Sequence, residues 1–456
     1  MQSHKNLFKL VMIFFILMLT PGLNRPAQAA SAKFIPKLFI GYNYNDNVDS
    51  VDDKYLTQLE MQWVDYLLGM DGNIKSQYYS FTLGGWAGYS QYVNASTELE
   101  DVLNVKLRRF DYYNLSLYGG FQYLRPSFAI DLSDTIKQDR RIADIFETAI
   151  SEFSEIYLYT DNVATAEVRF NAGQRSTFLF RYDYETITFP EPESDYLAAP
   201  ADVYRHSGFA RIDYQVSPKA KIALDLQGGQ WGYSAVKVPV GGGRWVERDL
   251  ADYNYYQALL AFEYNFTPRS SIELSGGAEQ RQYFGESEQR DLMDHILPVG
   301  RISFYSGEKY RYSLSASGEY AESHYGQDQF FTYGQGGAAF TYYFGKTLYA
   351  GISGSYRQDT FNREMLDLEN VWSEDRVDSV IIAQASIGWD VLRKYDTPYL
   401  SLILGYGYDW RDSNIDGEIG DYVDGYRGAY YSYDAVVQSA MFQVQFNPTI
   451  FVGSSK

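Results

Sequence analysis

The chain has 456 residues, among them 44 tyrosines and 28 phenylalanines, with four histidines and no cysteine. Its 58 acidic residues outnumber its 39 basic ones, giving a formal net charge of −19. The lack of cysteine excludes disulfide scaffolds, Cys-ligated zinc or iron–sulfur sites, thiol catalysis and a lipid-modified N-terminal cysteine. The negative charge argues against nucleic acid as a partner, because binding a phosphate backbone requires a basic face. An aromatic content of 17% argues against disorder.

Residues 1–29 are predicted to form a cleaved signal peptide. Two lysines precede an unbroken apolar run from Leu10 to Leu19, and Ala27-Gln28-Ala29 supplies a small-x-small cleavage site. The alternative is a membrane anchor, but the run is half of the roughly 20 apolar residues that a spanning helix needs. The sequence therefore predicts an exported chain.

The mature chain alternates apolar and polar residues almost throughout, which is the period of a β-strand. The stretches 178–184, 260–266 and 400–410 show this alternation most clearly. A sandwich or a propeller would also contain alternating strands, but strands in such proteins usually span about five or six residues. Many runs here exceed the roughly 9–11 residues that a strand needs to cross a bilayer. The pattern favours transmembrane strands.

Short and long connections between these runs alternate along the chain. Tight turns are predicted near residues 171–174, 217–219, 267–269, 306–308, 344–346 and 395–398. Long acidic stretches lie near residues 190–203, 236–252, 285–294, 361–376 and 412–427. This alternation is typical of an outer-membrane barrel with short periplasmic turns and long outer loops. The excess of tyrosine fits the aromatic girdles at the two membrane interfaces.

We therefore expect residues 30–456 to form one all-β domain, a transmembrane antiparallel up-and-down β-barrel of about 18 strands (about 16–20). Strands are expected to start near residues 34, 55, 76, 103, 115, 162, 176, 205, 220, 254, 270, 295, 309, 330, 347, 378, 398 and 431. The last run ends on Phe446, a terminal aromatic of the kind that barrel-assembly machinery reads, and residues 447–456 form a C-terminal tail. The expected location is the bacterial outer membrane, in contact with its lipid and lipopolysaccharide.

Residues 132–157 are expected to form a long connection with an amphipathic helix. Within Thr135–Phe153, isoleucines and phenylalanines recur at helical spacing among charged residues. Such a helix would either fold into the mouth of the barrel or cap its rim.

A barrel of this size encloses an aqueous lumen. The acidic residues are concentrated in the expected outer loops, so the strands and turns are nearly balanced in charge. Charged residues on the polar face of the strands are candidates for lining the lumen. They would act either as groups that select the solute or as hydrated ion pairs that neutralise one another. These candidates are Arg169, Arg181, Asp183, Arg211, Asp213, Asp225, Glu263, Glu273, Arg311, Arg357, Asp409 and Arg411.

One segment resembles the first part of a calcium-binding loop. Asp412, Asn414, Asp416 and Glu418 occupy its first ligand positions, with Gly417 at the turn position. The glutamate expected at the twelfth position is absent, because Val423 stands there. The segment is either a weak divalent-ion site or a solvated acidic loop, and no other cofactor is predicted.

Catalytic signals are weak. After signal cleavage the histidines are His206, His295 and His324, and none belongs to a recognisable nucleophile or metal motif. We therefore do not expect an enzyme.

The first strand runs from Phe34 through Tyr42-Asn43-Tyr44-Asn45-Asp46-Asn47 to Val48. This opening, with Pro36 and the Tyr-Asn-Asp-Asn ending, resembles the family of outer-membrane β-barrel porins found beside exopolysaccharide gene clusters. Later hairpins, at 204–233 and 269–283, are similar to the repeated pattern of that family. The resemblance implies a channel, with a polysaccharide export complex as a partner, and it transfers no individual site residue.

The sequence is compatible with three functions. The first is a porin-like channel for polar solutes or for exported polysaccharide. The second is a surface-display or envelope-assembly barrel that binds a partner or bridging divalent ions through its acidic loops. The third is a barrel enzyme that depends on the three histidines.

Overall fold

The computed structural model describes residues 31–46, 60–95, 111–142, 156–189, 202–234, 236–239, 245–248, 252–284, 295–309, 311–322, 331–361, 377–394, 397–413, 435–448 and 450–452. The predicted signal peptide lies outside these residues. No helix in the described part of the chain is long and apolar enough to span a membrane.

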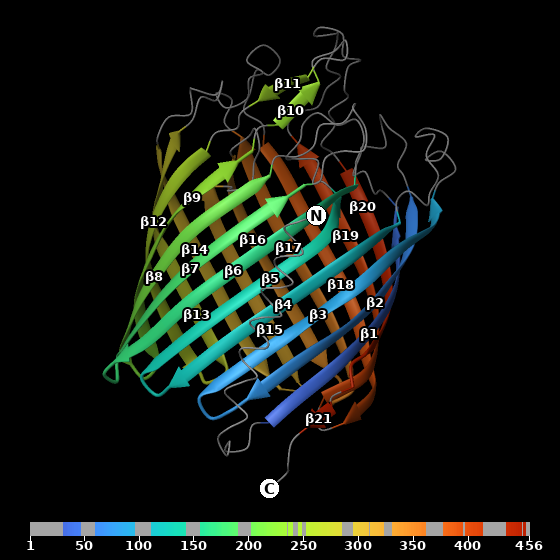
Figure 1. The fold of residues 1–456 in the computed structure, drawn as a ribbon, viewed down its shortest axis with the longest axis horizontal. Coiled ribbons are helices and arrows are strands. Elements are labelled where there is room, and N and C mark those ends of the chain that lie inside the picture. The colour runs from blue at the N-terminus through green and yellow to red at the C-terminus, as the bar shows by residue number, and fades with distance from the viewer. Residues whose placement is uncertain are drawn as a thin grey trace, which may run out of the picture.

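The described chain forms one large antiparallel barrel (Figure 1). The first nine strands are β1 (Ser31–Asn45), β2 (Met61–Lys75), β3 (Tyr79–Ala95), β4 (Tyr112–Arg125), β5 (Phe128–Ile142), β6 (Ile156–Ala172), β7 (Ser176–Thr188), β8 (Val203–Ser217) and β9 (Ala220–Tyr233). The next nine are β12 (Asp252–Thr267), β13 (Ser270–Phe284), β14 (His295–Glu308), β15 (Tyr312–Glu322), β16 (Phe331–Tyr343), β17 (Leu348–Phe361), β18 (Val377–Lys394), β19 (Thr397–Ser413) and β20 (Ala435–Phe446).

Each strand pairs with its neighbours in chain order, and β9 pairs directly with β12. The barrel closes where β1 pairs with β20, from Leu38 opposite Phe446 to Asn45 opposite Ser439. Among the described residues, 18 strands therefore form a closed antiparallel barrel, which confirms the predicted fold class and strand number.

Three short strands lie outside this ring. β10 (Val236–Pro239) and β11 (Trp245–Arg248) form a separate hairpin at the long-connection end of the barrel (Figure 1). β21 (Ile450–Val452) falls within the predicted C-terminal tail, and it pairs with the start of β1 beyond the end of β20.

The sequence prediction for the region around β5 is wrong about the helix and about where the strand starts. Residues 135–142, expected in a helix, belong to β5 and pair with β6 from Thr135 opposite Val163 to Ile142 opposite Ile156. The rest of the expected helix lies outside the described residues, as does the strand start expected near residue 103. The strand number is therefore correct although one expected start is unsupported and the start of β5 at Phe128 was not predicted.

The alternation of apolar and polar residues along each strand gives the barrel wall an apolar outer face and a more polar inner face. On β12, Leu260 and Phe262 are exposed on the outer face, whereas Leu259 and Ala261 are buried on the inner face. Leu260 pairs with Leu224 of β9, which in turn pairs with Ile212 of β8, so exposed apolar residues of adjacent strands lie side by side. A register shift of one residue would turn all these side chains inward, so burial in lipid specifies the register.

Short turns join the strands at one end of the barrel. Gly173, between β6 and β7, and Gly345, between β16 and β17, have φ values of 77° and 90°. A residue with a Cβ is strained in this left-handed region, so glycine permits the tight reversal. Both turns fall where the sequence predicted them.

A single charged substitution tests the assignment of residues to the outer face. Leu260 lies near the middle of β12 and is 66% exposed. We expect Leu260→Arg to lower the free energy of unfolding by roughly 2–4 kcal/mol, because arginine at the bilayer midplane loses hydration. Urea unfolding of the barrel in lipid vesicles measures this. Ser317→Arg, on the inner face of β15, is the control, and equal destabilisation by both would contradict the assignment of faces.

Candidate functional site

The candidate site is the inner face of the barrel wall. It carries charged side chains at positions that alternate with the exposed apolar residues, for example Arg211 and Asp213 on either side of Ile212. Eleven of the twelve residues predicted to line the lumen lie on strands at these inner positions: Arg169, Arg181, Asp183, Arg211, Asp213, Asp225, Glu263, Glu273, Arg357, Asp409 and Arg411. The twelfth, Arg311, lies instead in the turn between β14 and β15, paired with Glu308 at 3.1 Å. Because β14 ends at Glu308 and β15 begins at Tyr312, Arg311 is not on the inner face of a strand.

Ion pairs between residues two apart on one strand recur around the inner face. Arg181 donates to Asp183 at 2.9 Å on β7, and Arg357 donates to Asp359 at 2.6 Å on β17. The same spacing joins Lys137 to Asp139, Glu167 to Arg169, Arg211 to Asp213, Glu279 to Arg281 and Asp409 to Arg411. Residues i and i+2 of a strand point to the same side, so each cation is held against the wall by its own strand.

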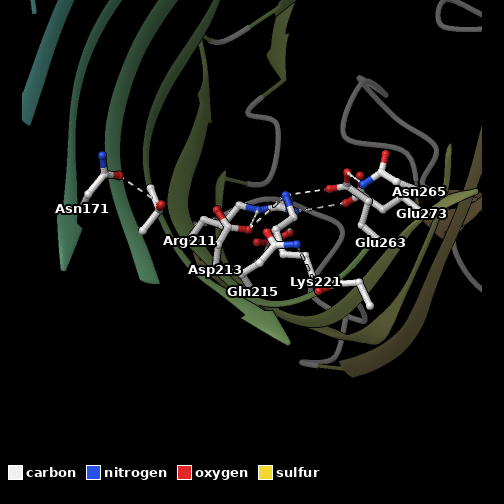
Figure 2. A network of polar contacts seen from close by, with 11 residues as sticks. Asn171, Arg211, Asp213, Gln215, Lys221, Glu263, Asn265 and Glu273 are labelled. Atoms are coloured by element: carbon white, nitrogen blue, oxygen red, sulfur yellow. Dashed lines mark hydrogen bonds and ion pairs between the residues drawn. The ribbon is translucent and has the colours of Figure 1, made fainter. Parts of the chain in front are cut away.

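Arg211 is the centre of the densest group of contacts (Figure 2). Besides Asp213 at 3.0 Å, it donates to Asp225 of β9 at 3.3 Å. Its second terminal nitrogen reaches Glu273 of β13 at 3.3 Å, past the two intervening strands β9 and β12. One guanidinium therefore connects carboxylates from three strands.

Lys221 of β9 extends this group. Its ammonium lies 2.6 Å from Glu263 of β12 and 3.4 Å from Asp213. Asn265 also donates to Glu263, at 3.2 Å. Figure 2 shows these side chains together on the concave side of the wall. We call the following six residues the β8–β13 ion cluster: Arg211, Asp213, Lys221, Asp225, Glu263 and Glu273.

A second group, around Arg281 of β13, was not predicted. Arg281 is fully buried, and it lies 2.9 Å from both Glu279 and Glu322, which are also buried. Its guanidinium carbon is 5.0 Å from the centre of the Tyr253 ring. The spacing of Glu279 and Arg281, which matches that of Arg211 and Asp213, could have revealed this pair in the sequence.

Buried aromatic residues surround this second group. Trp231, Tyr233, Tyr253 and Tyr255 form one packed cluster on β9 and β12, with Tyr283 of β13 against it. Trp231 pairs with Tyr253 and Tyr253 with Tyr283 in the sheet register, so the rings follow one row across three strands. These side chains cover the inner wall toward the long-connection ends of the strands.

The inner face of β14–β17 has a different character. It includes short hydroxylated side chains, and Ser303, Ser315, Ser317 and Ser355 are exposed. Charged residues of the inner face are exposed too, with side-chain exposures of 45% for Arg301 on β14 and 52% for Arg169 on β6. Inner-face exposure in the middle of the strands means that solvent reaches the interior of the barrel there.

The histidines and the predicted calcium loop are only partly described. His206 is on the outer face of β8, hydrogen-bonded to Tyr182, and His295 pairs with Glu322 at 2.8 Å. Asp412 lies at the end of β19, whereas Asn414, Asp416 and Glu418 lie outside the described residues, so that loop stays a prediction. Within the described residues, no group of three or more His, Asp or Glu side chains could hold a metal ion.

Comparison with known proteins finds likeness at the level of solved structures. No family model and no curated protein matches the chain. Acinetobacter baumannii OccAB4 aligns with a TM-score of 0.46 and 10% identity, covering 93% of this chain and 100% of its own. Pseudomonas aeruginosa OccK2 in complex with glucuronate aligns at 0.45 and 9%, covering 93% and 99%. The P. aeruginosa outer membrane protein OpdK aligns at 0.43 and 8%, covering 93% and 100%. No residue role is carried over from these proteins.

The burial of the group around Arg281 leads to a prediction about the stability of the barrel. We expect Arg281→Ala to lower the free energy of unfolding by about 3–5 kcal/mol, because Glu279 and Glu322 would remain buried without their cation. Arg169→Ala removes a half-exposed guanidinium and should cost less than about 1 kcal/mol. Urea unfolding in lipid vesicles compares the two variants. Equal small losses would show that Arg281 does not stabilise the wall.

Proposed function

We propose that the chain is an outer-membrane, porin-like channel through which small polar solutes diffuse. The observation that carries this proposal is the solvent-exposed polar inner face, exemplified by Arg169, Arg301 and Ser317, in a closed barrel of 18 strands. Side chains fill the interior of a barrel of about eight strands, whereas barrels of about 16–18 strands leave an aqueous channel. The exposed apolar belt supports a place in a membrane, and the closed barrel supports the outer membrane of a bacterium.

The two sides of the wall contribute differently to the proposed passage. Charged and aromatic side chains extend from β6–β9, β12 and β13, whereas the wall of β14–β17 carries serine and glycine beside the ion pairs of Arg301 with Glu319 and of Arg357 with Asp359. Short side chains leave the most room beside β14–β17, and their hydroxyl groups replace part of the hydration of a passing solute. This side is the open part of the passage.

Export of polysaccharide is a narrower form of the proposal. It requires the lumen to admit a polymer chain as well as a small solute. Swelling of liposomes in sugars of increasing length separates the two, since a general channel should reject long dextrans that a polymer exporter admits. The partner-binding alternative depends on outer loops that lie beyond the described residues.

Filling the open side should reduce the current. We expect the protein to conduct ions in planar bilayers and Ser317→Trp to lower its single-channel conductance, because the indole would occupy lumen volume beside β15. Leu260→Trp adds an indole on the outer face and serves as the control, with unchanged conductance expected. A wild-type barrel that folds but does not conduct would contradict the proposal.

A further inference from the structure

The cations of the inner face are held in ion pairs. A carboxylate oxygen lies within 3.4 Å of the side chains of Lys37, Lys137, Arg169, Arg181, Arg205, Arg211, Lys221, Arg281, Arg301, Arg357 and Arg411. Two further lysines, Lys33 and Lys75, lie near the short-turn ends of β1 and β2. Cations paired so closely present little positive field to a solute in the lumen.

The carboxylates are not matched in the same way. In the β8–β13 ion cluster, four carboxylates share two cations, Arg211 and Lys221. Around Arg281, two carboxylates share one guanidinium. On the other side of the barrel, Asp65 accepts hydrogen bonds from Asn43 at 2.8 Å and Ser90 at 2.6 Å, both neutral donors.

The same imbalance continues on the remaining strands. Asp131 of β5 accepts from the neutral amide of Gln122 at 3.0 Å. Arg301 of β14 is opposed by Glu319 of β15 at 2.8 Å, which leaves no excess cation on that side. In each of these groups within the described wall, carboxylates equal or outnumber the cations they contact. The described part of the inner face therefore carries net negative charge, whereas the sequence predicted a nearly neutral lumen.

Net charge on a lumen wall decides which ions enter. A wall of low dielectric constant focuses the field of fixed charges into the water of the pore and raises the local concentration of oppositely charged solutes. The Debye length is about 10 Å at 0.1 M salt, so the field of the β8–β13 ion cluster extends well into the lumen at that salt concentration.

We infer that the lumen is selective for cations and favours solutes that carry an amine or a guanidinium group over anions. The inference rests on the proposed channel function. Asp225 and Glu273 are the residues that determine selectivity within the cluster, because they are the second and third carboxylates on Arg211, which Asp213 already neutralises on its own strand. Anionic polymers are disfavoured in the same lumen.

The reversal potential of single channels across a KCl gradient tests the inference. With 0.1 M salt on the dilute side, the wild type should give the sign of cation selectivity, with a permeability ratio of potassium to chloride above one. Glu273→Gln, and more strongly Asp225→Asn combined with Glu273→Gln, should move this ratio toward one. Raising both solutions to about 1 M should do the same, since the Debye length falls to about 3 Å.

A matched control removes the same charge from the opposite face. Asp134 of β5 alternates with the inner-face residues, and it accepts a hydrogen bond from Asn162 at 2.9 Å. Asp134→Asn should leave the reversal potential unchanged. Glu273→Gln alone checks for misfolding in the double variant, because Glu273 is the most exposed carboxylate of the cluster at 36%.

The outcomes separate the two proposals. A conducting but anion-selective wild type would overturn the inferred selectivity and leave the channel function standing. Cation selectivity that survives unchanged in both variants would overturn the assignment of selectivity to Asp225 and Glu273. A folded barrel without conductance would overturn the channel function and the inference together.

Discussion

The structure depends on the requirement that every backbone amide and carbonyl within a lipid bilayer has a hydrogen-bond partner inside the protein. A flat sheet fails this requirement at its two edges, and closing the sheet removes both. Here the pairing of β1 with β20 joins residues about 400 positions apart, and β21 continues the pairing past the end of β20. The other neighbouring strands are sequential hairpins, so this seam is the contact that converts them into a barrel.

Closure has a consequence for charge. Once the wall separates lipid from water, polar side chains are restricted to its inner face, where Arg211 and its carboxylates remain partly hydrated. Partial hydration lowers the cost of bringing like charges together, so four carboxylates can share two cations. Around Arg281 the wall is buried, and the ion pairs there are closed by aromatic packing. One face of one sheet therefore contains both a solvated and a dry ionic group.

The sequence predicted most strand starts because hydrophobic alternation and turn chemistry are local properties. It failed around β5 because Ile136 and Ile142 fit both a helical stripe and an alternating strand, and only pairing with β4 and β6 selects the strand. It placed eleven of twelve candidate residues on the inner face, because successive side chains of a strand alternate between the inner and the outer face. Arg311 was misplaced because the exact end of a strand is decided by pairing.

By itself, the sequence determined that the chain alternates between a lipid face and a water face, where the short turns fall and which charged residues share a face. These follow from spacing along a single strand. Only the tertiary structure decided which charges meet, such as Arg211 with Glu273 or Arg281 with Glu322, residues separated by 62 and 41 positions. The physical reason is that the barrel register aligns strands that are distant in sequence. The balance of charge in the lumen depends on those contacts.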